Sequence, residues 1–499
     1  MQSTNQKCNP LASVIGLFLH STSTPELVIE MLAHCGLSIS PSSIHTAVSS
    51  LSVNAQESLR HLFSDMCASF VYDNFDMDFK SWQSSVDGPG TTLIHATSAF
   101  AFPLMHGTTS EDLDCAQLLW ATDPRNPAIP SNEKRPPYAW ANAMDAKYPH
   151  LDKTPLPTAI SPTHIPDLPH GPSLSHQILA WHFRNALVNS HPPFNNFHPL
   201  LGMPESILQI PITKTTTVPC RAMDINQSTQ DGQADILDNL FMQANIGDPH
   251  DTPGVRDIGN HVILVHGDLG TGERLQGVQM SRRIEATSAR RIQHTIFVMG
   301  LFYLQMAAAD AIWRMFIEPK TLRNSPTGLY QQACAILPHD TGRIGSKPGF
   351  RLMHDIIQQC TTARMLDCWH TAIIRKNQVN QSLKSLDDFA LTKPSWITIE
   401  KISHTLVKDY LNDSSSDNVE FNNNSIILQH LLQYMELTHA IKYGDIGRVE
   451  AMFIPWAFMF KAVGKHKYAA HLFKAINDLH YVYPPRLRYV FLVNVFRDT

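Results

Sequence analysis

The sequence predicts an α/β fold, a mixed sheet interrupted by a proline-rich insertion and by a large helical insertion. Two apolar runs, at 66–73 and 262–265, are rich in the β-branched and aromatic residues of buried strands. Between these runs, 18 of the chain's 33 prolines fall between Pro124 and Pro219, and proline disfavours both helix and ladder. Helical periodicity dominates after the second run. With 499 residues, the chain can form two or three domains, or one domain with large insertions.

The first segment, 1–60, is predicted to be helical. Residues 24–52 indicate a helix, a turn and a second helix, because Gly36 breaks an apolar periodicity and Ser40 or Ser42 can cap the second helix. This outline resembles a helix-turn-helix motif. Its turn is longer than in the usual DNA-reading version, so plain helix packing is the preferred interpretation.

The sheet is predicted to come from two separated parts of the chain. Strands at 66–73 and 91–102, joined by a turn at 87–90, place the first part of the core at 61–123. The proline-rich insertion follows at 124–230 and is irregular except for a helix near 173–188. The remaining segments are the second part of the core at 231–300, a helical insertion at 301–425 and a C-terminal helical part at 426–499 that completes the core.

Composition excludes several classes of protein. Charged residues make up 17% of the chain and the net charge is −5, so any nucleic-acid-binding surface has to be local. None of the eight cysteines forms a CxxC pair, which excludes the usual zinc and redox motifs. The longest apolar segment, 296–313, contains Gln305 and Asp310 and therefore indicates a core helix rather than a membrane span. We expect an intracellular protein with no membrane partner.

The most informative stretch is "NHVILVHGDLGTGERL" at 260–275. Its glycines have the GxxxxG spacing of a phosphate-binding loop, but that loop needs Lys and Ser or Thr next, and Glu273 and Arg274 stand there instead. The GxGxxG pattern of dinucleotide-binding loops is absent. The alternative functional group in this stretch is Asp268 itself, a carboxylate directly after a buried strand.

Asp268 and Asp73 are candidate metal ligands, because each acid follows an apolar strand. Carboxylate oxygens are hard ligands suited to Mg²⁺ or Mn²⁺, and phosphoryl transfer by two metals needs several of them. The ribonuclease H-like arrangement has one acid on a first strand, one on a later strand and a third on a C-terminal helix. The third acid is Asp445, with Glu450 or Glu436 as alternatives. The opposing interpretation is structural: Asp268 bonds to the amides of its own loop.

Two further groups are weaker candidates. Asp367 and His370 are three residues apart and would share one face of a helix, where they could assist the site or merely form a surface pair. Arg282, Arg283, Arg290 and Arg291 are predicted to lie on one helix and to form a basic stripe that contacts nucleic-acid phosphates. The alternative for these arginines is a solvated face paired with Glu285.

Several strings, taken in order, carry a resemblance to a known family. They are "YDNFDMDF", "DGPGTTLIHATS", "HVILVHGDLGTGERL", "MGLFYLQMAAADAIWR", "DTGRIGSKPGFRLMHDII", "MLDCWHTAI", "YMELTHAIKYGDIGRVEAMFIPWAFMFKAVGKHKYAAHLF" and "YPPRLRYVFLVN". Over roughly residues 20–495, the chain resembles domain-of-unknown-function family 6589, abundant in basidiomycete fungi. Members look like transposase-derived proteins with a ribonuclease H-like core. The family's recurring acids match Asp73, Asp268 and Asp445, whereas Tyr303 stands where we expect a histidine.

The resemblance and the acids together lead to one functional expectation and one rival. The first is a transposase-like nucleic-acid phosphoryl transferase, intact or degenerate, in which Asp73, Asp268 and Asp445 bind Mg²⁺ or Mn²⁺ and DNA is the partner. The rival is a non-catalytic DNA- or protein-binding scaffold derived from a transposase. Either function predicts a nuclear location.

Overall fold

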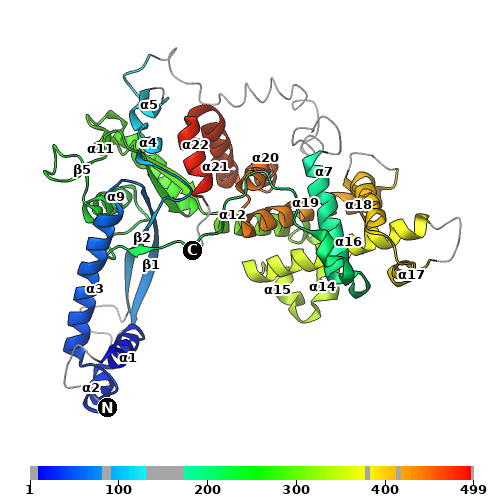
Figure 1. Cartoon of the computed structure of the whole chain (residues 1–499), viewed down its shortest axis with the longest axis horizontal. Helices are drawn as coiled ribbons and strands as arrows, with labels where there is room; N and C mark the ends of the chain where they lie inside the picture. Colours follow the sequence, from blue (N-terminus) through cyan, green and yellow to red (C-terminus); the bar gives the residue numbers. More distant parts are fainter. Residues whose placement is uncertain are drawn as a thin grey trace. The chain divides into compact units, whose positions relative to one another are not determined.

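The computed structural model describes residues 9–80, 91–121, 123–130, 173–376, 383–411 and 417–495. The turn predicted at 87–90 and residues 131–172 of the proline-rich insertion lie outside these ranges. The chain divides into two compact units (Figure 1). Unit 1 contains Met1–Leu104, Thr108–Gln117 and Thr215–Phe297, and unit 2 contains Met105–Gly107, Leu118–Lys214 and Val298–Thr499.

A five-stranded mixed sheet confirms the predicted α/β class. Its strands stand in the order β3-β2-β1-β6-β7. β1 and β2 form a long antiparallel pair, β3 is antiparallel to β2, and β6 is parallel to β1. The bounds are β1 Ala68–Lys80, β2 Thr91–Pro103, β3 Val218–Pro219, β6 Ile263–Gly267 and β7 Thr295–Met299, and a separate parallel pair joins β4 Ile246–Gly247 to β5 Arg256–Asp257.

One face of the sheet carries the core of unit 1. Phe70 and Tyr72 of β1 are fully buried there beside Val265 of β6. The C-terminal end of α3 (Pro41–Leu62), α9 (Gln230–Ala244) and α10 (Leu269–Ser281) supply the apolar side chains that cover this face. Because side chains alternate along a strand, Val71 and Asp73 of β1 point to the opposite face.

The N-terminal helices form a small group at the start of unit 1. α1 (Pro10–Ser21) and α2 (Glu26–His34) both contact α3, and Ser40 caps α3 by accepting from the Ser43 amide. The helices predicted between 24 and 52 are therefore present, and α3 continues to Leu62. Figure 1 shows α1 and α2 beside the N-terminal end of α3.

The exposed edge of the sheet beyond β3 is closed by a side chain. The Gln243 amide of α9 accepts a hydrogen bond from the Arg221 backbone N–H at 2.8 Å and donates one to the Arg221 carbonyl at 3.3 Å. A neighbouring strand would make the same two bonds. Gln243 therefore occupies the place of a further strand at this point.

Unit 2 is almost entirely helical. Its core contains Trp369 and Phe183, both fully buried between α7 (Leu174–Ser190), α16 and α18. The helix predicted near 173–188 and the predicted helical blocks are confirmed. The other helices have the bounds α12 Leu301–Phe316, α13 Lys320–Arg323, α14 Leu329–Ile336, α15 Thr341–Gly345, α16 Phe350–Lys376, α17 Leu386–Leu391, α18 Trp396–Leu411, α19 Val419–Lys442, α20 Ile446–Ala462, α21 His466–Asn477 and α22 Pro485–Val493, with short helical segments at η2 Pro192–Phe197, α8 His198–Leu201, η4 Pro338–Asp340 and η5 Asp478–Val482.

The prediction that helical periodicity dominates after the second apolar run is wrong between residues 282 and 300. α10 ends at Ser281, and the chain continues as η3 (Arg282–Ile284), α11 (Ser288–Arg291) and β7 before α12 begins at Leu301. The β-branched and aromatic run Thr295–Met299 forms β7, the fifth strand of the sheet. The sequence pattern did not reveal this strand, because five residues are too few to show a period of two. α4 (Ser110–Leu113) and α5 (Ala116–Ala121) complete the described helices. Among the described residues, no helix has the length and apolar character needed to cross a bilayer.

Candidate functional site

Asp73 and Asp268 occupy equivalent positions on neighbouring parallel strands. The register pairs Phe70 with Val265 and Val71 with His266. Two residues further along, the same register places Asp73 opposite Asp268. The two acids that the sequence singled out therefore belong to one place in unit 1, at the C-terminal end of β6.

Asp73 lies within a strand rather than at its end. β1 continues to Lys80 and pairs with β2 along its whole length, with Asp73 opposite Ser98. The prediction of a strand ending at Asp73 is therefore wrong, because the hairpin extends beyond the core. The Asp73 carboxylate is half-buried and accepts a hydrogen bond from the Asn74 backbone N–H at 2.8 Å.

Asp268 is the N-cap of α10. One carboxylate oxygen, Oδ1, accepts from the Thr271 backbone N–H at 2.7 Å and from the Thr271 hydroxyl at 2.8 Å. An N-cap carboxylate satisfies a helix amide that has no partner within the helix, and its charge suits the helix N-terminus. No described residue donates a hydrogen bond to the other oxygen, Oδ2. The structural interpretation of Asp268 is therefore confirmed for one oxygen.

The glycines around Asp268 are explained by packing. The predicted glycine loop is the first turn of α10. A Cβ on Gly272 would lie 2.4 Å from the Phe297 ring of β7, and a Cβ on Gly267 would lie 3.0 Å from the Thr271 side chain. Only glycine lets helix and strand approach this closely. The GxxxxG spacing therefore reflects helix-to-sheet contact.

Buried polar groups lie on the core side of the same strand ends. The Gln233 amide donates to the Tyr72 hydroxyl, and the Gln227 amide donates to the Thr271 hydroxyl. Burial, and after it the Asp268 charge, raises the pKa of the Tyr72 phenol well above its usual range. The oxygens Oε1 of Gln227 and Gln233 are buried without a hydrogen-bond partner among the described residues. Residue spacing gives no signal for either glutamine, because Gln233 lies 161 residues from Tyr72 and Gln227 lies 44 residues from Thr271.

Asp445 belongs to unit 2 and is fully occupied as a structural group. It caps α20 by accepting from the Arg448 backbone N–H, and it also accepts from the backbone N–H groups of Ile207 and Leu208, each at 3.1 Å. Both carboxylate oxygens take part, and the residue is 2% exposed. The next glycine, Gly447, is required because a Cβ there would lie 2.6 Å from the Ile207 side chain. Asp445 therefore anchors residues 207–210 to the start of α20.

Glu436, the first alternative for the third acid, lies in a buried ion-pair cluster of unit 2. The Arg448 guanidinium donates to both of its oxygens, at 2.7 and 2.5 Å, and His182 Nε2 lies 2.8 Å from Oε2. Burial raises the pKa of Glu436, but the hydrogen bonds from His182 and Arg448 outweigh burial and lower it from 4.5 to about 2. Residue spacing gave no signal for this cluster, because His182 stands 254 residues away.

Glu450, the second alternative, is also paired within unit 2. Its Oε1 lies 3.0 Å from His480 Nε2 and 3.0 Å from the Arg488 guanidinium. These hydrogen bonds and charges lower its pKa against the effect of burial. Each of the three acids proposed to complete a metal site is thus held by groups of its own unit.

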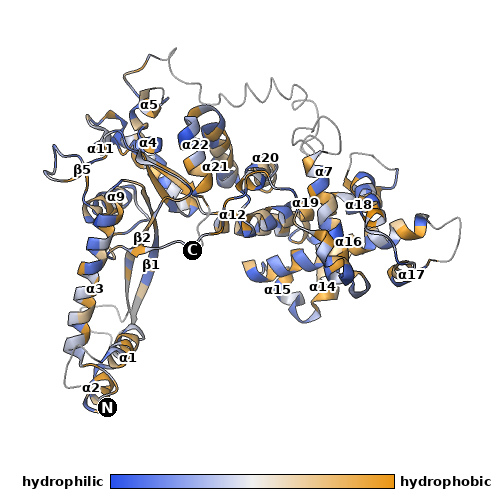
Figure 2. Ribbon diagram, in the orientation of Figure 1, coloured by the Kyte–Doolittle hydropathy of each residue, from blue (hydrophilic) through white to orange (hydrophobic). Residues whose placement is uncertain are grey.

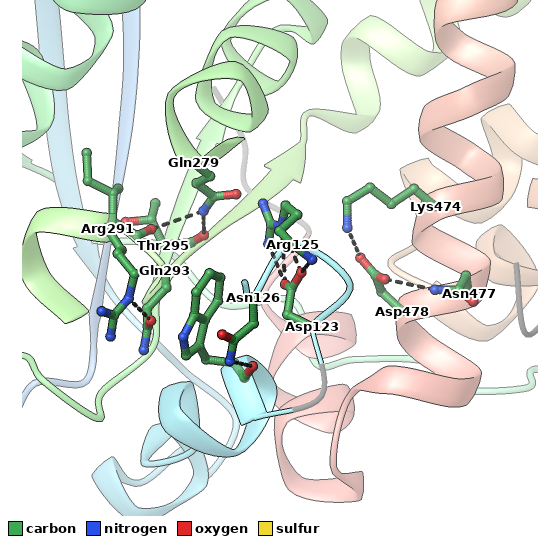
Figure 3. A network of polar contacts seen from close by, with 12 residues as sticks. Asp123, Arg125, Asn126, Gln279, Arg291, Gln293, Thr295, Lys474, Asn477 and Asp478 are labelled. Carbon is green, nitrogen blue, oxygen red and sulfur yellow. Dashed lines mark hydrogen bonds and ion pairs between the residues drawn. The ribbon is translucent and has the colours of Figure 1, made fainter. Parts of the chain in front are cut away.

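The four arginines do not share one helix. Arg282 and Arg283 are in η3, and Arg290 and Arg291 end α11. Arg290 pairs with Asp251 at 2.8 Å, and Arg291 donates to Gln293 at 2.8 Å and to two backbone carbonyls. Figure 3 shows Arg291 with Gln293 and, nearby, Gln279 donating to the Thr295 carbonyl.

Arg282 and Arg283 have fewer protein contacts than the other two arginines. Arg282 lies 4.0 Å from the Asp238 carboxylate, and Arg283 donates to the Met280 carbonyl. The predicted single-helix stripe is therefore wrong. What remains of it is this one pair of adjacent arginines.

Asp367 and His370 do share α16, as their spacing predicts. His370 Nε2 lies 3.1 Å from the Lys384 carbonyl, and Asp367 is exposed. Both belong to unit 2, whereas Asp73 and Asp268 belong to unit 1. Their auxiliary role stays a prediction.

The predicted three-acid metal site does not fit the residues present. Two-metal chemistry needs several carboxylate oxygens that can coordinate, whereas both oxygens of Asp445, which is 2% exposed, already accept backbone N–H groups. Among the described residues, no three His, Cys, Asp or Glu side chains are grouped so that they could hold a metal ion. Asp73 and Asp268 are a pair without a third member, and we derive no reaction step through a metal.

Comparison with family models finds one match: a family of unknown function (DUF6589) matches residues 159–497. The match includes Asp268 and Asp445 and begins after β1 and β2, so Asp73 lies outside it. No curated protein and no solved structure matches the chain.

Proposed function

This chain belongs to the DUF6589 family, and from that membership and the geometry of its sheet we propose that it is a transposase-derived, ribonuclease H-like protein that binds nucleic acid without cutting it. The strand order supports the fold. Three antiparallel strands, β1 to β3, stand beside two further strands, β6 and β7, with β6 parallel to β1. This order supports the proposal of a ribonuclease H-like sheet, in which α9 and α10 would be the connecting helices.

The observation that carries the proposal is the hydrogen bonding of Asp445. Its two oxygens accept three backbone N–H groups, so replacing those bonds by a metal would leave one buried and two part-buried donors unpaired. Glu436 and Glu450 are equally engaged by arginine and histidine. A protein that had kept the chemistry would keep one of these acids free.

Arg282 and Arg283 are the proposed phosphate contacts. With the described residues, their guanidinium groups make only a distant ion pair and one bond to a backbone carbonyl. Phosphate contacts by arginine give affinity that falls with salt and carries little sequence preference. A nucleic-acid partner makes the nucleus the proposed location.

The binding test is fluorescence anisotropy with labelled double- and single-stranded DNA over a series of salt concentrations. We expect Arg282→Glu/Arg283→Glu to weaken binding and to reduce the salt slope by about 1 for each phosphate that is no longer bound. The matched control is Arg290→Gln/Asp251→Asn, which removes an existing ion pair at no change in net charge. Binding that is absent at low salt, or equally weakened by the control, would contradict the proposal.

The cleavage test separates the scaffold from its rival, a metal-dependent nuclease. The observation favouring the rival is that Asp73 and Asp268 are aligned and that Oδ2 of Asp268 accepts no hydrogen bond from the described residues. We expect wild type to cut labelled DNA in Mg²⁺ or Mn²⁺ no faster than Asp73→Asn/Asp268→Asn. Cleavage that either single substitution abolishes in folded protein would establish the nuclease instead.

A further inference from the structure

The first two helices of unit 1 have two apolar faces each. On α1, Gly16 packs against Ile39 and Ile44, where a Cβ would lie 2.8 and 3.3 Å from their side chains. Leu11, Val14 and Phe18 recur at the spacing of one helix face, roughly opposite Gly16. These three side chains are 73%, 63% and 64% exposed.

α2 repeats this arrangement. Ile29 is buried at 3% exposure, whereas Leu27 and Met31, one turn apart on the other side of the helix, are 79% and 58% exposed. Val28 next to them is 39% exposed. We call the set Leu11, Val14, Phe18, Leu27, Val28 and Met31 the outer apolar surface. Figure 2 shows both helices largely in the colours of apolar residues.

A surface helix of a globular protein normally turns a polar face to water, and α1 does not. It contains no Asp, Glu, Lys or Arg, and Glu26 and Glu30 are the only such residues between 9 and 37. Exposed apolar clusters of this kind mark interaction sites. The missing Lys and Arg argue against nucleic acid and against an anionic membrane surface, because both need basic residues beside the apolar ones.

The size of the outer apolar surface fits half of a symmetric dimer. With on the order of 100 Å² of apolar area for each large side chain, its six members expose roughly 400 Å². A standard interface takes about 800 Å² from each partner, of which a little over half is apolar. A two-fold pairing also places like against like, and a surface almost without charge does not repel its own copy.

We propose that α1 and α2 are the dimerisation surface of this protein, and that the occupant of their outer apolar surface is the same surface of a second copy. The inference is independent of the proposed function, because it rests on neither the acids nor the arginines.

The test is sedimentation equilibrium of the full chain over a wide range of concentrations. Wild type should be a dimer, and Val14→Glu/Phe18→Glu should shift the dissociation midpoint to a concentration at least about tenfold higher. Leu391→Glu, at an equally exposed apolar site of unit 2 (80% exposed), is the control and should leave the dimer intact. Circular dichroism checks that each variant is folded.

A second readout protects the test from a variant that fails to fold. Because Cys35 at the end of α2 is a free, exposed thiol, Cys35→Ser is added to both proteins, and Phe18→Cys should then give a covalent dimer with a short thiol cross-linker faster than Leu391→Cys does. A wild type that stays monomeric at every concentration would overturn the proposal. The proposal would also be overturned if the wild-type protein were a monomer that floats with neutral phosphatidylcholine vesicles and Val14→Glu/Phe18→Glu no longer floated with them. The occupant of the outer apolar surface would then be lipid.

Discussion

The same four-residue pattern begins a helix in each unit, and the two copies are used differently. Gly267-Asp268-Leu269-Gly270 begins α10, and Gly444-Asp445-Ile446-Gly447 begins α20. Both aspartates are N-caps. Asp268 uses one oxygen, on its own helix, whereas Asp445 uses both and also binds a segment 237 and 238 residues away. In both places the aspartate of a Gly-Asp pair caps a helix, and only Asp268 keeps an oxygen that accepts no hydrogen bond from the described residues.

The largest expected effect concerns the buried ion-pair cluster of unit 2, in which Arg448 of α20 binds Glu436. Arg448 is 2% exposed and binds Glu436 with two hydrogen bonds. Arg448→Ala leaves the Glu436 charge with His182 alone, so we expect a loss of about 3–5 kcal/mol in unfolding free energy. The control, Arg343→Ala, breaks an exposed pair with Asp340 and should cost under about 1 kcal/mol. Equal shifts in thermal melting would show that burial is not what separates them.

Acid should unfold unit 2 through the same cluster. The pKa of Glu436 is about 2 in the folded chain against 4.5, and burial with nearby charges lowers that of His439 from 6.5 to about 3. The pKa of each group is lower in the folded chain than in the unfolded chain. The stability that each group contributes is therefore complete above its unfolded pKa and is lost as the pH falls toward its folded pKa.

We expect the melting temperature of unit 2 to decline below pH 6.5 through its histidines of lowered pKa, which are His439, His176, His354, His404 and His430, and more steeply below 4.5 through Glu436. Glu436 should account for a loss of about 3 kcal/mol. His439→Gln should make the earlier decline smaller, because the other four histidines remain, and should keep the later one. A melting temperature that is flat from 6.5 to 4.5 would contradict this assignment.

The two aspartates should differ when each is truncated. Asp445→Ala leaves three N–H groups without their partner, one of them buried and two part-buried, and we expect a loss of about 2–4 kcal/mol. Asp268→Ala removes a single cap and should cost about 1 kcal/mol. Denaturant unfolding of both variants measures the difference. Equal losses would mean that the additional bonds of Asp445 contribute nothing.

The smallest effect comes from the second glycine of each pattern. In Gly270→Ala the new methyl meets only flexible side-chain ends at 3.3 Å, so better helix propensity should stabilise α10 by about 0.5–1 kcal/mol. In Gly447→Ala the methyl meets Ile207 at 2.6 Å, and overpacking should cost about 1–3 kcal/mol. The two melting shifts should have opposite signs.

Local sequence was enough to predict most elements, and it placed Asp73 and Asp268 on two strands that are neighbours in the sheet. Apolar runs predicted β1, β2 and β6, and proximity of two acids follows once β1 and β6 are neighbours. The remainder depended on contacts between distant residues. Nothing near Asp445 in sequence indicates that Ile207 and Leu208 take its oxygens, and nothing near Glu436 indicates His182. The short strand β7 was not predicted, because the sequence around it has helical periodicity.

The amide of Gln243 has a consequence for how the sheet ends. By pairing with both backbone groups of Arg221, it removes the row of bonding groups that a strand from another molecule would need at this point. β3 itself is two residues long and ends in Pro219, which has no N–H to offer. The sheet is thereby closed to strand addition at these two positions, which disfavours strand-by-strand growth into fibrils on this side.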